Sequence, residues 1–151
     1  MQAQKIFMAA DHGGAILKNA LKAYLKEKGL EVVDYGPENA DVSADYPDKA
    51  LELIKGIKSD KNAKGILICT SGIGMSMMAN RFPFIRGALV FNPEMAEMAR
   101  GHNDANVLIF GAKFISEVEA KKCVDIFLAT DFLGGRHERR VNKLSCIKEA
   151  E

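Results

Sequence analysis

Short apolar runs that alternate with stretches of helical periodicity constrain this 151-residue chain more than any other feature. Each run of five or six residues is followed by a segment with an apolar side chain at every third or fourth position, which predicts alternating strands and helices. We predict strands at 6–10, 30–35, 65–69, 86–91 and 106–110. We predict helices at 16–25 with a C-cap at Gly29, at 46–58, in a short segment before Pro83, from about Pro93, and at 116–130.

Repeated strand–helix alternation implies right-handed crossovers and a parallel sheet that helices cover on both faces. The nearly continuous apolar strands agree with a sheet buried on both sides. The predicted fold class is therefore α/β: a three-layer, doubly wound, Rossmann/flavodoxin-like parallel sheet of five strands. Residues 1–151 are expected to form one domain with a basic C-terminal arm from about residue 131. This arm is either a solvated helix or a segment laid over a neighbouring subunit.

Composition excludes several classes of protein. Apolar residues make up 48% of the chain and charged residues 27%, as in soluble globular proteins. A formal net charge of +1 provides no global field for nucleic acid or an anionic membrane. No apolar run approaches the roughly 18 residues of a membrane span. Three cysteines without zinc spacing predict neither a disulfide framework nor a metal site, and the absence of a signal-peptide pattern favours the cytoplasm.

Two polar clusters follow predicted strands, where ligands bind in open parallel sheets. Residues 11–14 (Asp-His-Gly-Gly) follow the first strand, and residues 69–74 (Cys-Thr-Ser-Gly-Ile-Gly) follow the third. In a flavodoxin-like strand order these strands are neighbours, so the clusters meet. The glycine turn leaves backbone N–H groups free to hold an anion, although a tight turn without a ligand is the alternative. Met77 occupies the third glycine position of a dinucleotide fingerprint, which disfavours nucleotide binding.

Cysteine and histidine side chains are the candidates for chemistry. Cys69 ends the third strand close to a helix N-terminus, a position that favours thiolate, whereas an isolated strand cysteine is commonly inert. Cys123 and Cys146 have no motif around them and are interpreted as structural. His12, His102 and His137 are all predicted in polar, loop-like contexts, without metal-ligand spacing. Acid–base and phosphate roles are therefore expected for them.

Six strings of the sequence together resemble the ribose-5-phosphate isomerase B family, and the likeness runs from about residue 5 to residue 145. The wider family includes galactose-6-phosphate isomerase subunits and enzymes that accept allose 6-phosphate. The strings are 10–14 (ADHGG), 45–47 (DYP), 68–76 (ICTSGIGMS), 79–80 (AN), 100–107 (RGHNDANV) and 134–140 (GGRHERR).

The resemblance implies interconversion of ribose 5-phosphate and ribulose 5-phosphate through an enediolate in the pentose phosphate pathway, with no metal or cofactor. It implies a homodimer or homotetramer with the active site shared between subunits. Cys69 would be the base, and His102 of the partner subunit would open the sugar ring. The implied substrate-binding residues are Asp11, His12, Tyr46, Thr70, Ser71, Gly72, Ile73, Gly74, Asn103, Lys113, Arg136 and Arg140, of which His12, Arg136 and Arg140 would bind phosphate.

Three positions depart from the family pattern. Thr70 replaces the usual glycine, Ser71 replaces the commoner threonine, and Lys113 stands where an arginine is usual. Another branch of the family uses a glutamate base at the position of Met75, which leaves Cys69 as the candidate here. An isomerase of a six-carbon sugar phosphate and a non-catalytic sugar-phosphate binding module remain the alternatives.

Overall fold

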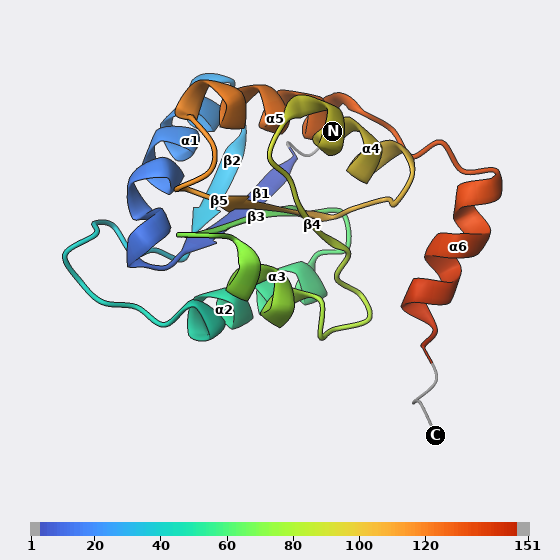
Figure 1. Cartoon of the computed structure of the whole chain (residues 1–151), viewed down its shortest axis with the longest axis horizontal. Coiled ribbons are helices and arrows are strands. Elements are labelled where there is room, and N and C mark those ends of the chain that lie inside the picture. The colour runs from blue at the N-terminus through green and yellow to red at the C-terminus, as the bar shows by residue number, and fades with distance from the viewer. Residues whose placement is uncertain (1–3, 148–151) are drawn as a thin grey trace.

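A parallel sheet forms the centre of the computed structural model, which describes residues 4–147 (Figure 1). Within those residues the sheet has five strands in the order β2-β1-β3-β5-β4. The predicted α/β fold is confirmed, and β1 and β3 are neighbours as the flavodoxin-like order required. The strands are β1 (Lys5–Ala10), β2 (Glu31–Asp34), β3 (Lys64–Cys69), β4 (Gly87–Leu89) and β5 (Val107–Gly111).

Helices cover both faces of the sheet and make three layers (Figure 1). Helices α1, α4 and α5 pack on one face, and α2 and α3 pack on the other. A single 3₁₀ turn, η1 (His12–Gly14), links β1 to α1. The helices are α1 (Ala15–Glu27), α2 (Tyr46–Ser59), α3 (Ile73–Ala79), α4 (Pro93–Gly101), α5 (Glu117–Ala129) and α6 (Arg136–Ser145).

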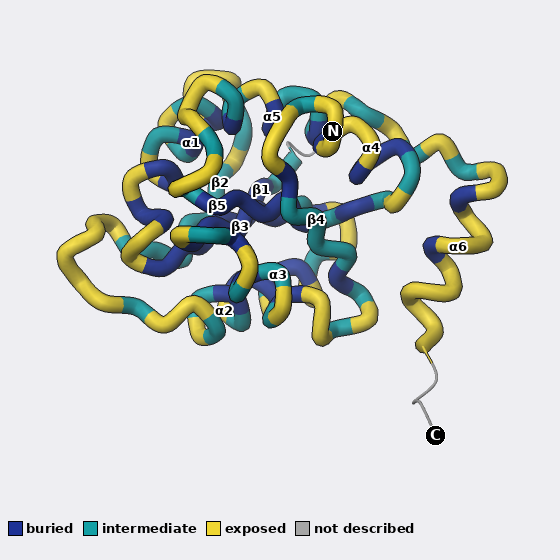
Figure 2. Tube along the Cα trace, viewed as in Figure 1, coloured by how far each residue is buried: buried dark blue, intermediate teal, exposed yellow. Residues whose placement is uncertain are grey.

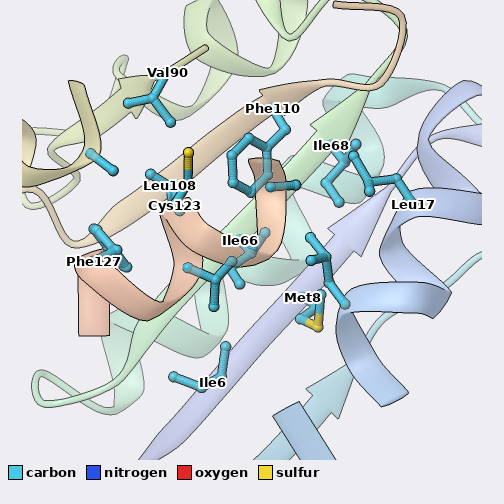
Figure 3. Close-up of a cluster of buried hydrophobic side chains, with 14 of the residues drawn as sticks. Ile6, Met8, Leu17, Ile66, Ile68, Val90, Leu108, Phe110, Cys123 and Phe127 are labelled. Carbon is cyan, nitrogen blue, oxygen red and sulfur yellow. The ribbon is translucent and has the colours of Figure 1, made fainter. Parts of the chain in front are cut away.

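Alternate side chains of each strand enter two separate apolar cores. Ile6 and Met8 of β1 point toward α1 and α5, where they join Phe110 and Phe127 (Figure 3). Phe7, the residue between them, points the other way and packs in the core beneath α2 and α3. This two-residue period buries both faces of every central strand, which explains why the strands read as continuous apolar runs.

The ends of the elements agree closely with the turn signals, except at the sheet edges. Gly29 has φ +80° just after α1, which is the left-handed conformation expected of a glycine after a helix. Asn92 caps α4 and Ser116 caps α5 through side-chain oxygens. The strand predicted at 86–91 is only Gly87–Leu89 in the structure, and it lies at the edge of the sheet, where it pairs with β5 alone.

Helix α6 stands apart from the three layers. It extends beyond the edge of the sheet at the right of Figure 1, and most of its surface is exposed (Figure 2). His137 and Val141 are the buried residues of this helix. The predicted basic arm is therefore helical, and Arg136 and Arg140 lie one turn apart on it. No helix among residues 4–147 is long and apolar enough to cross a lipid bilayer.

Candidate active site

Asp11 and Cys69 lie side by side because β1 and β3 pair in parallel. Ala10 is in register with Ile68, and the Asp11 N–H donates to the Ile68 carbonyl at 3.2 Å. The Asp11 side chain is buried, and its Oδ1 accepts a hydrogen bond from the Gly14 N–H at 3.2 Å, which caps η1. Its second oxygen is not needed for the cap, so Asp11 can both hold the turn and receive a hydroxyl donor.

The thiol of Cys69 sits at the last position of β3, inside a tight backbone loop. The side chain is 4% exposed, and its sulfur accepts a hydrogen bond from the Gly72 N–H at 3.1 Å. Gly72 has φ +78°, a conformation that side-chain-bearing residues rarely adopt. A Cβ there would meet Leu89 and would approach the Gly111 nitrogen to 3.0 Å. Glycine at this position is therefore required for the loop to aim an N–H group at the sulfur.

Two other segments, η1 and the start of α2, close around this loop. The Thr70 hydroxyl fills the space that a Cβ on Gly13 would occupy. A Cβ on Gly74 would approach the Tyr46 ring to 2.7 Å, so the tyrosine covers the start of α3. The larger Thr70 is thus accommodated by a glycine in η1, and the Tyr46 ring lies beside the loop.

Two further predicted residues reach the same edge of the sheet. His12 is exposed, and its Nδ1 accepts from the Ala44 N–H at 3.4 Å, which ties η1 to the segment before α2. The Lys113 N–H donates to the Thr70 carbonyl at 3.0 Å, so the β5–α5 connection runs beside the cysteine loop. We call this set the thiol half-site: Asp11, His12, Tyr46, Cys69, Thr70, Ser71, Gly72, Ile73, Gly74 and Lys113.

His102, Asn103, Arg136 and Arg140 are not part of the thiol half-site. Cys69 is in register with Gly111 at the carboxyl end of β5, whereas residues 102 and 103 precede the amino end of that strand. The length of β5 alone places the carboxyl ends of the strands about 13 Å from their amino ends. Figure 1 shows the same separation, with the β2–α2 connection at the left and α6 at the right. We call the second set the histidine half-site, and it includes His137.

The imidazole rings of His102 and His137 stack within the histidine half-site. Their centroids are 4.4 Å apart and their planes are 8° from parallel. Burial lowers the pKa of His137, and the neighbouring His102 and arginines lower it further. The prediction that every histidine lies in a loop is wrong for His137, which belongs to α6 and is buried. Helix α6 has too few apolar residues for its sequence to reveal which of its faces meets the domain.

Sequence reasoning missed two charged clusters beside the half-sites. Lys18 is fully buried and its ammonium group contacts both oxygens of Asp34, at 2.7 and 2.9 Å. Asp104 lies between two arginines in the turn after His102. The sequence does not show that these charged residues pair, because lysine, arginine and aspartate are common surface residues. No group of three or more histidine, cysteine or acidic side chains within residues 4–147 has the geometry to hold a metal ion.

Comparison with known proteins identifies the family of this chain. Residues 6–144 match the family model described as Ribose/Galactose Isomerase. A probable ribose-5-phosphate isomerase B of Mycoplasma genitalium is 44% identical over 141 residues, which is 92% of each chain.

Solved structures show the same fold. The ribose 5-phosphate isomerase of Thermotoga maritima has a TM-score of 0.91 and 45% identity, over 95% of this chain and 99% of that one. Ribose-5-phosphate isomerase B from Mycoplasma genitalium with bound ribulose-5-phosphate has a TM-score of 0.91 and 40% identity, over 96% of both chains. This chain belongs to the ribose/galactose isomerase family.

Proposed function

We propose that this protein is a ribose-5-phosphate isomerase of the pentose phosphate pathway in the cytoplasm, which interconverts ribose 5-phosphate and ribulose 5-phosphate. The observation that carries the proposal is the Cys69 sulfur, held at 3.1 Å by the Gly72 N–H beside Asp11 at the sheet's ligand-binding edge. Family membership and the relative with bound ribulose-5-phosphate support this substrate.

Cys69 is proposed to act as the base on the open-chain sugar. The thiolate takes the proton from carbon 2, and the electron pair moves toward the aldehyde to form an enediolate. The same proton returns to carbon 1, while the hydroxyl proton on oxygen 2 passes to oxygen 1, which leaves a ketone at carbon 2. A base matched to its proton typically contributes roughly 10²–10⁴ in rate. No redox group takes part in this step.

The backbone of residues 70–74 is proposed to stabilise the enediolate oxygen. The first N–H groups of α3 have no acceptor within the helix, and they belong to the residues that follow Gly72 directly. Ser71 supplies a hydroxyl, which already accepts from the Ile73 N–H at 3.2 Å and so is oriented. Loss of one such preorganised donor typically lowers kcat by roughly 10²–10³. Asp11 and Tyr46 would contact the sugar hydroxyls.

The remaining groups are proposed to come from a second copy of the chain. His102 of the partner subunit would protonate the ring oxygen with the help of the partner's Asn103, and the partner's Arg136 and Arg140 would bind the phosphate with His12. Within one chain the two half-sites lie at opposite ends of the strands, which supports a site completed by a second copy.

Exposed apolar side chains flank both half-sites, as an interface between subunits requires. Ile73 and Met77 are exposed on α3 beside the cysteine loop. Met98 and Leu133 are exposed next to His102, and the Leu133 N–H donates to the Gly101 carbonyl at 3.0 Å. Contiguous exposed apolar surface rimmed by polar groups is typical of interaction sites. We therefore propose a homodimer or homotetramer with a shared site.

Subunit mixing tests this arrangement. Cys69→Ala and His102→Asn chains should each be inactive with ribose 5-phosphate, and a verified mixture should regain activity, because one site of each heterodimer has both residues intact. Cys146→Ala, which removes an exposed cysteine outside both half-sites, is the matched control and should keep full activity. Near wild-type turnover by Cys69→Ala, or no recovery after subunit exchange, would contradict the proposal.

A coupled assay across phosphorylated sugars tests the substrate. We expect ribose 5-phosphate to be used with a higher kcat/KM than allose 6-phosphate or galactose 6-phosphate, because Thr70 and Tyr46 crowd the cysteine loop. A preference for a six-carbon sugar would favour the alternative isomerase. Binding of sugar phosphate without turnover of any of them would indicate a binding module.

A further inference from the structure

The turn between α4 and β5 carries His102 and contains a residue in the left-handed backbone conformation. Asp104 has a φ of +48°. Among residues 4–147 it is the one residue other than glycine with a positive φ. Few side-chain-bearing residues adopt this region, and aspartate is among those that do, because its short polar side chain can bond locally. The contacts that hold Asp104 therefore determine the path of the turn.

Two arginines hold Asp104 from opposite sides. Arg100 Nη1 lies 2.8 Å from Asp104 Oδ1, and Arg86 Nη2 lies 3.1 Å from Asp104 Oδ2. The Arg86 Nε also donates to the Asp104 carbonyl at 2.7 Å. One carboxylate thus joins a residue of α4 to the residue that precedes β4, and the left-handed turn is closed between them.

Arg100 also bonds the backbone at the end of this turn and at the end of α5. It is buried, and it donates to the Ala105 carbonyl at 2.8 Å and to the Thr130 carbonyl at 3.3 Å. Thr130 begins the connection to α6, whose His137 ring stacks on His102. One guanidinium group consequently bonds the backbone that follows His102 and the first residue of the connection that leads to His137.

We propose that Asp104 is a positioning residue for ring opening: with Arg86 and Arg100 it fixes the turn that presents His102 to the thiol half-site of the partner subunit. The inference rests on the proposed function, in which His102 protonates the ring oxygen. A proton donor on a loosened turn would spend less time within hydrogen-bonding reach of the substrate, so ring opening would slow while proton transfer at Cys69 would not.

Two substitutions at Asp104 separate the effect of its carboxylate from the effect of its backbone conformation. Asp104→Gly tolerates φ +48° and removes the carboxylate, while Asp104→Asn tolerates the conformation and keeps one acceptor oxygen. Arg86 and Arg100 retain their main-chain acceptors in both variants, so the fold should persist. Asp125→Asn removes an ion pair of similar length, to Lys28 on the α1–α5 surface, and is the matched control.

The readout is the saturated rate from ribose 5-phosphate, which is mostly cyclic, against that from ribulose 5-phosphate, which is open-chain. For Asp104→Gly we expect the ribose rate to fall about tenfold to hundredfold and to stop scaling with enzyme concentration as uncatalysed ring opening becomes limiting. The ribulose rate should stay within about threefold of wild type. Asp104→Asn should fall between Asp104→Gly and wild type, and Asp125→Asn should match wild type.

Subunit mixing gives an independent readout. Asp104→Gly should regain ribose turnover when mixed with Cys69→Ala and should not regain it with His102→Asn, since Asp104 and His102 act in the same half-site. Equal losses with both sugars, or an unchanged ratio of the two rates, would overturn the positioning role. If His102→Asn itself shows no selective loss with ribose 5-phosphate, the ring-opening assignment fails, and that result is distinct from a failure at Asp104 alone.

Discussion

Removal of the Asp34 carboxylate should be among the most destabilising single changes in this protein. Lys18 is 0% exposed, and among residues 4–147 its ammonium contacts Asp34 Oδ1 and Oδ2 and the Asn19 side chain, all within 2.9 Å. Asp34→Asn leaves that ammonium buried without an opposite charge. Breaking a buried pair in this way typically costs about 3–5 kcal/mol. For a chain of this length, that corresponds to a fall in Tm of about 6–20 °C.

The reverse change should cost less, and this asymmetry is the sharper test. In Lys18→Met, Asp34 keeps Lys22 at 2.8 Å and the Gly36 N–H at 2.8 Å, so we expect a loss of about 1–3 kcal/mol. The double variant should be more stable than Asp34→Asn alone, because it leaves no buried charge unmatched. Glu31→Gln breaks a surface pair with Lys5 at 3.7 Å and should cost at most about 1 kcal/mol.

Urea unfolding at one protein concentration measures these differences. The reasoning is refuted if Asp34→Asn costs no more than Lys18→Met, or no more than Glu31→Gln. Acid titration gives a second check. Burial raises the pKa of Asp34, but hydrogen bonds from Lys18, Lys22 and Gly36 outweigh burial, so its pKa lies below the ordinary value. Its stabilisation is present above about pH 4 and is lost as the pH falls through the lowered pKa, a loss that Asp34→Asn should not show.

Three further predictions concern a thiol, a histidine and a glycine. Burial raises the pKa of Cys123 to about 11, so roughly one molecule in a thousand is thiolate at pH 8. Mass spectrometry of the native protein should therefore find Cys146 alkylated well before Cys123. Rapid modification of Cys123 would contradict its burial. Burial lowers the pKa of His137, so the unfolded chain binds its proton first and stability should fall as the pH drops below about 6.5. NMR should show this imidazole titrating below that value, and His137→Gln should remove part of the pH dependence. Gly72→Ala should lower the free energy of unfolding by about 1–2 kcal/mol from the φ of +78° alone. It should also lower kcat by at least about tenfold, because the added Cβ meets Leu89 and moves the N–H away from the sulfur. A wild-type kcat would show that this N–H is not needed.

Local sequence signals were sufficient for the architecture and for placing Asp11, Cys69 and the glycine turn together. Apolar periodicity predicted the order of strands and helices, since a strand buried on both faces and an amphipathic helix have different repeat lengths. The parallel order then placed the residues after β1 and β3 at one edge, where Asp11 and Cys69 are neighbours. The glycine turn at 72–74 was recognisable because few other residues can follow that path.

The tertiary structure alone decided which charged and titratable groups meet. Lys18 pairs with Asp34 from another element, Asp104 is held by Arg86 and Arg100, and His137 turns its ring onto His102. Polar side chains such as these carry no periodic signal, because their burial depends on whether a partner from a distant segment arrives. Their positions relative to Cys69 follow from the direction of β5, which separates the two half-sites within one chain. Periodicity along the sequence therefore specifies the layers, whereas pairing between distant segments determines the site's geometry.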